Sequence, residues 1–257
     1  MRVISHVAAN TFREAVRDRV LYNLVFFALL MVGAAPLFGQ ISIGVERIIL
    51  VNLGLTAITL FGVIIAIFIG TGLVSKEIEK KTLYTVLSRP VRRWEFILGK
   101  YFGLAATLAV NGALMAGGFF VALFWVTRSF HRADLQLLEA LYLILLQFMV
   151  ITALALLFST FTTPIFSAVF SFAMFAIGSF AGDLRSFAAL TKGPQKELAI
   201  AMSYLVPNFG ALNVVAEVAH QRGVSGALLL HSTGYAALYA AAALSAAILI
   251  FERRDLK

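Results

Sequence analysis

The sequence predicts an all-α polytopic membrane protein, and three observations carry that prediction. Of the 257 residues, 61% are hydrophobic and only 13% are charged, which is about half the charged fraction of an ordinary soluble domain. Several uncharged runs exceed the roughly 20 residues that a helix needs to cross a bilayer. The charged residues gather in short segments between these runs. Because lipid cannot satisfy open backbone groups, the apolar runs are expected to be helices.

Six runs have the length and composition of membrane-spanning helices. The second and third are longer than a bilayer requires, so we expect them to tilt or to protrude from the membrane. Together they predict a single transmembrane domain over residues 1–257. The six predicted spans are residues 20–39, 48–74, 96–126, 137–160, 164–182 and 228–251.

The basic residues predict the orientation of these spans. With six crossings, 14 of the 21 Lys and Arg residues fall on the side that holds both termini. Cytoplasmic segments are enriched in Lys and Arg, so both termini are predicted to be cytoplasmic. The same enrichment accounts for the formal charge of +8. The sequence shows no basic groove with stacking aromatic residues, so no nucleic-acid partner is expected.

Residues 1–19 have the pattern of an amphipathic helix, which predicts a helix lying in the cytoplasmic membrane interface. The alternative is that they are the helical start of the first span. Apolar side chains recur every four residues, at Ile4, Ala8, Phe12, Val16 and Val20. The opposite face carries His6, Asn10, Arg13 and Arg17.

Residues 183–227 include a further apolar stretch, LAIAMSYLVPNFGALNVVAEVA. A seventh span here would carry Pro207, Asn208, Asn213 and Glu217 into the membrane, where polar and charged groups are costly. It would also move the basic C-terminus to the outer side. The sequence therefore predicts two short helices, broken at Pro207–Asn208, on or within the extracytoplasmic leaflet.

The segment 75–95, SKEIEKKTLYTVLSRPVRRWE, holds the densest charge in the chain. Glu77 and Lys81 have the favourable i, i+4 spacing of a helical ion pair, and acids at Glu77 and Glu79 suit a first helical turn. Pro90 ends the helix. The pattern predicts a short amphipathic cytoplasmic helix between the second and third spans. An ordinary basic loop is the alternative.

The run EIEKKTLYTVLSRPVRRWEFILGKYFG resembles the signature of the type 2 (ABC-2) ABC transporter permeases. In that family Glu, Thr-Leu, Leu-Ser-x-Pro, an Arg/aromatic pair and Gly-Lys recur in this order. Lys81 stands where many members have Gly. The six spans, YLVPNFGALN and the FERRDL ending are also similar, best to the branch associated with multicopper-enzyme maturation. The matching residues are Glu77, Thr82, Leu83, Leu87, Ser88, Pro90, Arg93, Gly99 and Lys100.

This resemblance implies the permease subunit of an ATP-driven exporter in a prokaryotic-type cytoplasmic (inner) membrane. Two permease subunits would pair, as a homo- or heterodimer, and each would dock a separate ABC ATPase. STFTTP at 159–164 would be a second, smaller contact. The implied ATPase interface is Glu77, Lys80, Lys81, Thr82, Leu83, Tyr84 and Leu87.

The sequence contains no phosphate-binding motif GxxxxGK[ST]. We therefore expect no cofactor in this chain, with ATP and Mg²⁺ bound by the partner ATPase, and the chain itself is not expected to be an enzyme. A membrane scaffold or an intramembrane enzyme without an ATPase partner is the alternative function. No serine stands with a histidine and an acid in a recognisable motif.

Asn52, Asn111 and Gln147 lie within predicted spans. They could line a polar translocation path, or they could form hydrogen bonds between helices, which are worth about 0.6–2 kcal/mol.

Histidines and glycines in the remaining chain have simpler interpretations. His131, His220 and His231 lack a second ligand at helical spacing, so no metal site is expected. The pairs Gly99/Gly103 and Gly178/Gly182 have the spacing of close helix packing. We expect them to pack within the subunit rather than form a dimer seam.

Overall fold

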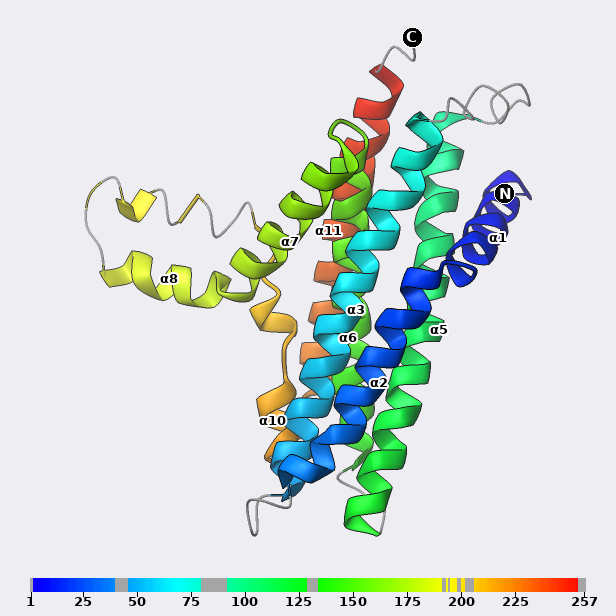
Figure 1. The fold of residues 1–257 in the computed structure, drawn as a ribbon. Coiled ribbons are helices and arrows are strands. Elements are labelled where there is room, and N and C mark those ends of the chain that lie inside the picture. Colours follow the sequence, from blue (N-terminus) through cyan, green and yellow to red (C-terminus); the bar gives the residue numbers. More distant parts are fainter. Residues whose placement is uncertain are drawn as a thin grey trace.

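The structure is a computed structural model, and it describes residues 2–39, 46–79, 92–128, 134–190, 193, 195–197, 200–201 and 206–253. These residues form a helical bundle without a strand (Figure 1), which confirms the predicted fold class. In chain order the elements are α1 (Arg2–Val16), α2 (Arg19–Gly39), α3 (Glu46–Glu79), α5 (Arg93–Thr127), α6 (Leu135–Ser159), α7 (Pro164–Ser179), α8 (Ala181–Leu190), the 3-10 turn η2 (Gly210–Leu212), α10 (Val215–Ala219) and α11 (Gly226–Arg253).

Four helices among the described residues are long and apolar enough to cross a membrane. They lie in α3, α5, α6 and α11, and they match the predicted second, third, fourth and sixth spans. The helix α2 has 21 residues and covers the predicted first span. The chain is therefore an integral, multi-pass membrane protein.

The helix α7 is shorter than the fifth span predicted over 164–182. It has 16 residues, about 24 Å of helix, whereas the hydrocarbon core is about 30 Å thick. It ends where the segment 206–210 crosses it. The backbone N–H of Phe209 donates to the carbonyl of Gly178 (3.0 Å), and a Cβ at Gly178 would clash with the Pro207 carbonyl oxygen. Beyond this crossing, α8 turns away from the bundle (Figure 1).

Within this crossing segment, Pro207 and Asn208 are non-helical, as the sequence predicts. Asn208 is tied to α11, because its backbone N–H donates to the Tyr235 hydroxyl (2.8 Å). The chain then continues through η2 and α10, which pack against α6, and α10 also contacts α3. Both η2 and α10 follow the break, where one of the two short helices was predicted. The helix predicted before the break falls partly outside the described residues and stays a prediction.

Small residues allow the long helices to pack closely, as is common between membrane helices. Phe119 of α5 fills the space opposite Gly54 of α3, and Phe148 of α6 fills the space opposite Gly62. An ion pair between Arg47 and Asp134 (2.7 Å) joins the starts of α3 and α6. We call this the α10 end of the bundle, because α10 lies beside it, and the opposite end, crossed by α1, the α1 end (Figure 1).

Candidate functional site

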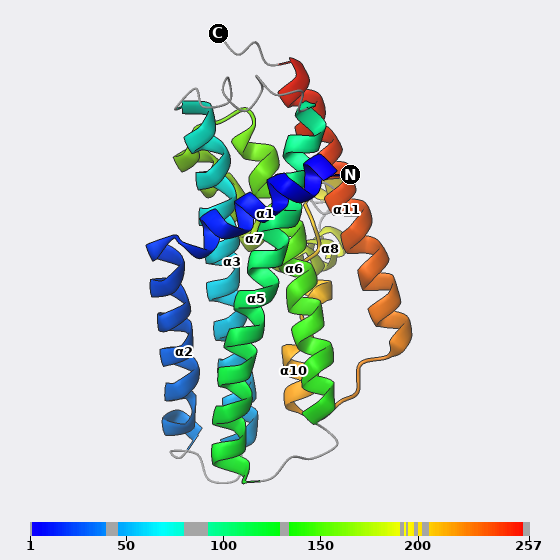
Figure 2. The same cartoon turned by 90° about the vertical axis from the view of Figure 1, so that its right-hand side faces the viewer.

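The α1 end brings together four elements that are distant in the sequence. They are α1, the first turn of α5, the turn between α6 and α7, and the last turn of α11 (Figures 1 and 2). The helix α3 also ends there, at Glu79, and α5 begins at Arg93. The predicted ATPase interface therefore lies in the connection between two helices that both reach this end.

The predicted interface residues themselves are only partly described. Glu77 belongs to α3, which runs without interruption from Glu46 to Glu79. Glu77 and Glu79 therefore lie in the last turn of α3, not in the first turn of a separate helix, because the helix predicted to end near residue 74 continues. The other predicted interface residues, Lys80, Lys81, Thr82, Leu83, Tyr84 and Leu87, lie outside the described residues.

Arg93 fastens the start of α5 to the end of α11. One guanidinium nitrogen donates to the carbonyls of Phe251 (2.8 Å) and Glu252 (2.9 Å). The last carbonyls of a helix have no intrahelical partner, so a cation there is doubly favourable. The guanidinium also lies over the Phe251 ring (5.8 Å), and Phe96 stacks on the same ring. These contacts join the first turn of α5 to the last turn of α11.

The helix α1 crosses α5 steeply at Gly99 and Gly103 (Figure 2). A Cβ at Gly103 would lie 2.6 Å from the Ala8 carbonyl oxygen, and one at Gly99 would lie 2.6 Å from Val7 side-chain atoms. The two backbones can therefore approach only because both positions are glycine. This confirms the expectation that Gly99 and Gly103 pack within the subunit. In Gly178/Gly182, only Gly178 has a close neighbour.

Lys100 lies inside this crossing, although it is charged. Lys100 is only 1% exposed. Its ammonium group lies 3.7 Å from the Glu14 carboxylate of α1 and over the Phe96 ring, 5.6 Å from the ring centre. A buried cation is tolerated only where such groups replace water. The polar side of α1, with His6, Asn10, Arg13 and Arg17, is exposed, which agrees with the amphipathic pattern.

The turn at 159–164 also lies at the α1 end (Figure 1). Its backbone is closed by the Thr162 N–H, which donates to the Phe158 carbonyl (3.0 Å). Pro164 begins α7, where a missing N–H has no cost. Phe161 is exposed at this turn, so it is available to a contacting protein.

The three interior polar residues do not gather at one level. By helix rise, Asn52 lies about 9 Å from the α10 end, Gln147 about 18 Å and Asn111 about 24 Å. The Asn52 side chain donates to the carbonyl of Ile48 in its own helix (3.0 Å). Asn111 and Gln147 are buried, and the Asn111 amide nitrogen has no hydrogen-bond partner in the described structure. The three residues therefore lie at different depths of the bundle, and their role in a translocation path stays a prediction.

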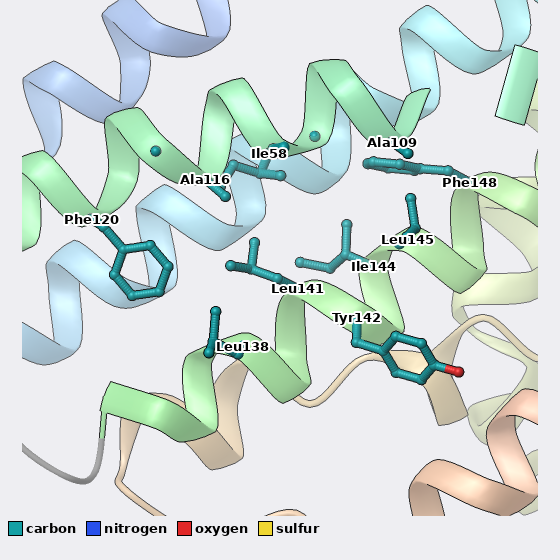
Figure 3. A pocket seen from close by; sticks show the side chains of 13 residues that line it. Ile58, Ala109, Ala116, Phe120, Leu138, Leu141, Tyr142, Ile144, Leu145 and Phe148 are labelled. Atoms are coloured by element: carbon teal, nitrogen blue, oxygen red, sulfur yellow. The ribbon is translucent and has the colours of Figure 1, made fainter. Parts of the chain in front are cut away.

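A cavity of about 420 Å³ lies instead between α5 and α6, with Ile58 of α3 at its base. Figure 3 shows apolar side chains around it, among them Leu141, Ile144 and Phe148. The polar group nearest to it is the Tyr142 hydroxyl, which is already bonded to Thr233 of α11 (2.8 Å). Sequence reasoning missed this cavity. The available signal was the small residues at helical spacing on α5, namely Ala109, Gly112, Ala113, Ala116 and Gly117.

The helix α7 exposes an aromatic and aliphatic face that no described part of this chain covers. The rings of Phe166 and Phe170 stack along it (6.3 Å). An exposed apolar face of this size contacts either lipid or another membrane helix. The large side chains are Ile165, Phe166, Val169, Phe170, Phe172 and Ile177.

Comparison with known proteins agrees with this architecture. The class defined by the fold is a multi-pass helical membrane protein. The family model described as "ABC-2 family transporter protein" matches residues 5–256, nearly the whole chain, so the chain belongs to the ABC-2 transporter family. It is a permease component of an ABC transporter. No curated protein sequence matches it.

Proposed function

We propose that this chain is the permease subunit of an ATP-driven exporter and that a separate ATPase subunit docks at its α1 end. Membership of the ABC-2 family supports the first part. The observation that carries the second is the convergence of α1, the start of α5, the 159–164 turn and the end of α11 at the end of the bundle where α3 ends at Glu79. Residues 76–88 are the proposed primary contact, and the 159–164 turn is the smaller one.

The proposed work of the subunit is conformational. ATP binding would draw the ATPase subunits together and displace the 76–88 segment, and the bundle would switch between inward- and outward-facing states. Arg93 supports this proposal, because it joins α11 to the first turn of α5. Force applied before Arg92 would therefore reach two membrane-spanning helices at once.

A second permease subunit is part of the proposal. The exposed face of α7, with Phe166 and Phe170, is the surface proposed to contribute to that pairing. Substrate would then pass between the subunits, rather than through a path lined by Asn52, Asn111 and Gln147 within one chain. The proposed branch of the family is the one associated with multicopper-enzyme maturation, which the sequence resembles.

Charge reversal at Glu77 tests the docking site. We expect Glu77→Lys to insert normally, because the residue lies beyond the span, but to lose ATPase co-purification or coupled hydrolysis. The expected cost is about 1–3 kcal/mol for a lost charge-assisted contact, or roughly 5- to 150-fold in affinity. The measurement is co-purification and ATPase activity with the co-expressed nucleotide-binding subunit.

The matched control is Glu46→Lys, which reverses an exposed carboxylate at the α10 end. It should leave ATPase binding unchanged. Arg92→Glu is a second comparison, since Arg92 is exposed at the start of α5 and is expected to affect membrane anchoring more than docking. If Glu77→Lys keeps full binding and coupled hydrolysis, the role assigned to residue 77 is wrong.

The proposed orientation has its own test. The chain has no cysteine, so single cysteines at Lys81, Lys257 and Arg132 can be labelled one at a time with a membrane-impermeant reagent. Lys81→Cys and Lys257→Cys should react only from the cytoplasmic side, and Arg132→Cys only from the other. Labelling of Lys257→Cys from outside would require an odd number of crossings and would overturn the proposal that both termini are cytoplasmic.

A further inference from the structure

A second cavity, of about 380 Å³, opens between α2 and α5 on a different side of α5 from the cavity of Figure 3. Both helices contribute side chains at helical spacing. Leu29 closes it at one end by packing over Gly118. From there the groove runs toward the α10 end. Its lining residues are Leu29, Gly33 and Leu37 of α2, with Gly118, Val121, Ala122 and Trp125 of α5.

A cation stands at the mouth of this groove. Arg128 directly follows α5, and its guanidinium carbon lies 4.8 Å from the centre of the Trp125 ring. The backbone at Arg128 is left-handed (φ 53°), and its N–H donates to the Phe124 carbonyl (2.9 Å). Arg128 is exposed, and among the described residues no carboxylate forms an ion pair with it. The groove therefore combines an apolar length with a positive charge at one end.

We propose that this groove binds one phospholipid with an anionic headgroup, with an acyl chain along α2 and α5 and the headgroup phosphate at Arg128. The dimensions agree with such an occupant. Ten residues separate Gly118 from Arg128, which is about 15 Å of helix. That is about half of a 30 Å hydrocarbon core, the depth of one leaflet. Tryptophan at this level matches the usual composition of the membrane–water interface.

The charge at the mouth argues for an anionic rather than a zwitterionic lipid. Arg pairs with phosphate through parallel hydrogen bonds, and an extra negative charge on the headgroup is favoured further by a nearby cation. The proposed lipid would bridge α2 and α5 where the two helices leave space between them. This inference is independent of the ATPase, so it can fail or succeed separately from the proposed function.

Tryptophan fluorescence can test the site directly, because the chain has only two tryptophans. In the Trp94→Phe variant, Trp125 in the groove is the sole tryptophan, so excitation selective for tryptophan reports on it alone. The protein would be placed in phosphatidylcholine nanodiscs containing equal mole fractions of either acyl-brominated phosphatidylglycerol or acyl-brominated phosphatidylcholine. We expect phosphatidylglycerol to quench Trp125 with about fivefold higher apparent affinity, the effect of one cation near an anionic lipid.

Two substitutions separate the acyl site from the headgroup site. A Cβ at Gly33 would meet nothing within 4 Å, so Gly33→Leu can fill the groove without a clash and should reduce quenching by both lipids. Arg128→Gln should lower phosphatidylglycerol quenching to the phosphatidylcholine level. Two control variants should keep the fivefold preference. Gly117→Leu projects into open space from the other side of α5, and Arg222→Gln changes an exposed position near the start of α11.

Two results would contradict the proposed lipid site. Equal quenching by the two brominated lipids would mean that only nonselective surrounding lipid reaches Trp125, and the proposed site would be wrong. A phosphatidylglycerol preference that survives both Gly33→Leu and Arg128→Gln would move the selective site elsewhere on the bundle and would also overturn the proposal.

Discussion

The two halves of α5 use glycine in opposite ways. In the first half, Gly99 and Gly103 are covered by α1, and the two backbones are in contact. In the second half, Gly112 and Gly117 line the cavity between α5 and α6, and a Cβ at Gly117 would meet nothing within 4 Å. Gly118 is packed closely against Leu29 of α2 and borders the second cavity. The same residue type therefore allows close packing where another helix or side chain lies against it, and leaves a cavity where no side chain fills the space. The first half is in close contact with another helix, and the second half borders the groove proposed above to bind lipid.

Among the variants that test this comparison, Gly103→Leu should lose the most stability. Its side chain would have to displace the Ala8 carbonyl and Thr11, and such overpacking costs about 2–3 kcal/mol. We expect a lower unfolding midpoint and faster hydrogen exchange throughout α1. Gly117→Leu is the matched control in the other half, where a Cβ meets nothing within 4 Å. Equal stability of the two variants would show that α1 is not fixed at this crossing.

Arg93→Gln should have the next largest effect, because it weakens the link between α5 and α11 without altering either helix. The loss of charge-assisted bonds to two helix-terminal carbonyls is expected to cost about 1–2 kcal/mol. Spin labels placed on the first turn of α5 and the last turn of α11 should report a broader distance distribution. Arg253→Gln, exposed in the same turn of α11, is the control. An unchanged distance distribution would mean that Arg93 does not hold α5 and α11 together.

Glu14→Gln should have the smallest effect of the three. The carboxylate is 42% exposed and lies 3.7 Å from the Lys100 ammonium, so solvent and salt screen the pair, and its contribution is expected to be below about 1 kcal/mol. The difference in unfolding midpoint from the unmodified chain should shrink in 1 M salt. A salt-independent loss as large as that of Gly103→Leu would mean that the ion pair, rather than glycine packing, holds α1.

The sequence predicted the parts of the fold that depend on local composition. Apolar runs defined α2, α3, α5, α6 and α11 because only a helix satisfies its backbone in lipid. The four-residue spacing of small residues predicted the packing at Gly99 and Gly103. The break at Pro207–Asn208 was also predictable, because proline lacks an N–H and polar groups are costly within lipid.

The parts that the sequence did not predict depend on contacts between distant segments. Residues 164–182 are uniformly apolar, and nothing local to them indicates that Pro207 and Phe209 will cross α7 at Gly178. The acids at 77 and 79 favoured a new helix start, because the helix dipole disfavours acids in a last turn, yet α3 continues through both residues. The two cavities are lined by residues from different helices, α5 with α3 and α6 in one case and α5 with α2 in the other, so no single segment encodes them.

The most direct test of the central proposal, that an ATPase docks at the α1 end, is site-specific photo-crosslinking in membranes that contain the co-expressed transporter components. A photoreactive amino acid would replace Tyr84 in the 76–88 segment, and a matched one would replace Ser225, exposed just before α11. We predict that the probe at position 84 forms a covalent product with a nucleotide-binding subunit and that the probe at position 225 does not. No ATPase product at position 84, or equal products at both positions, would contradict the proposal.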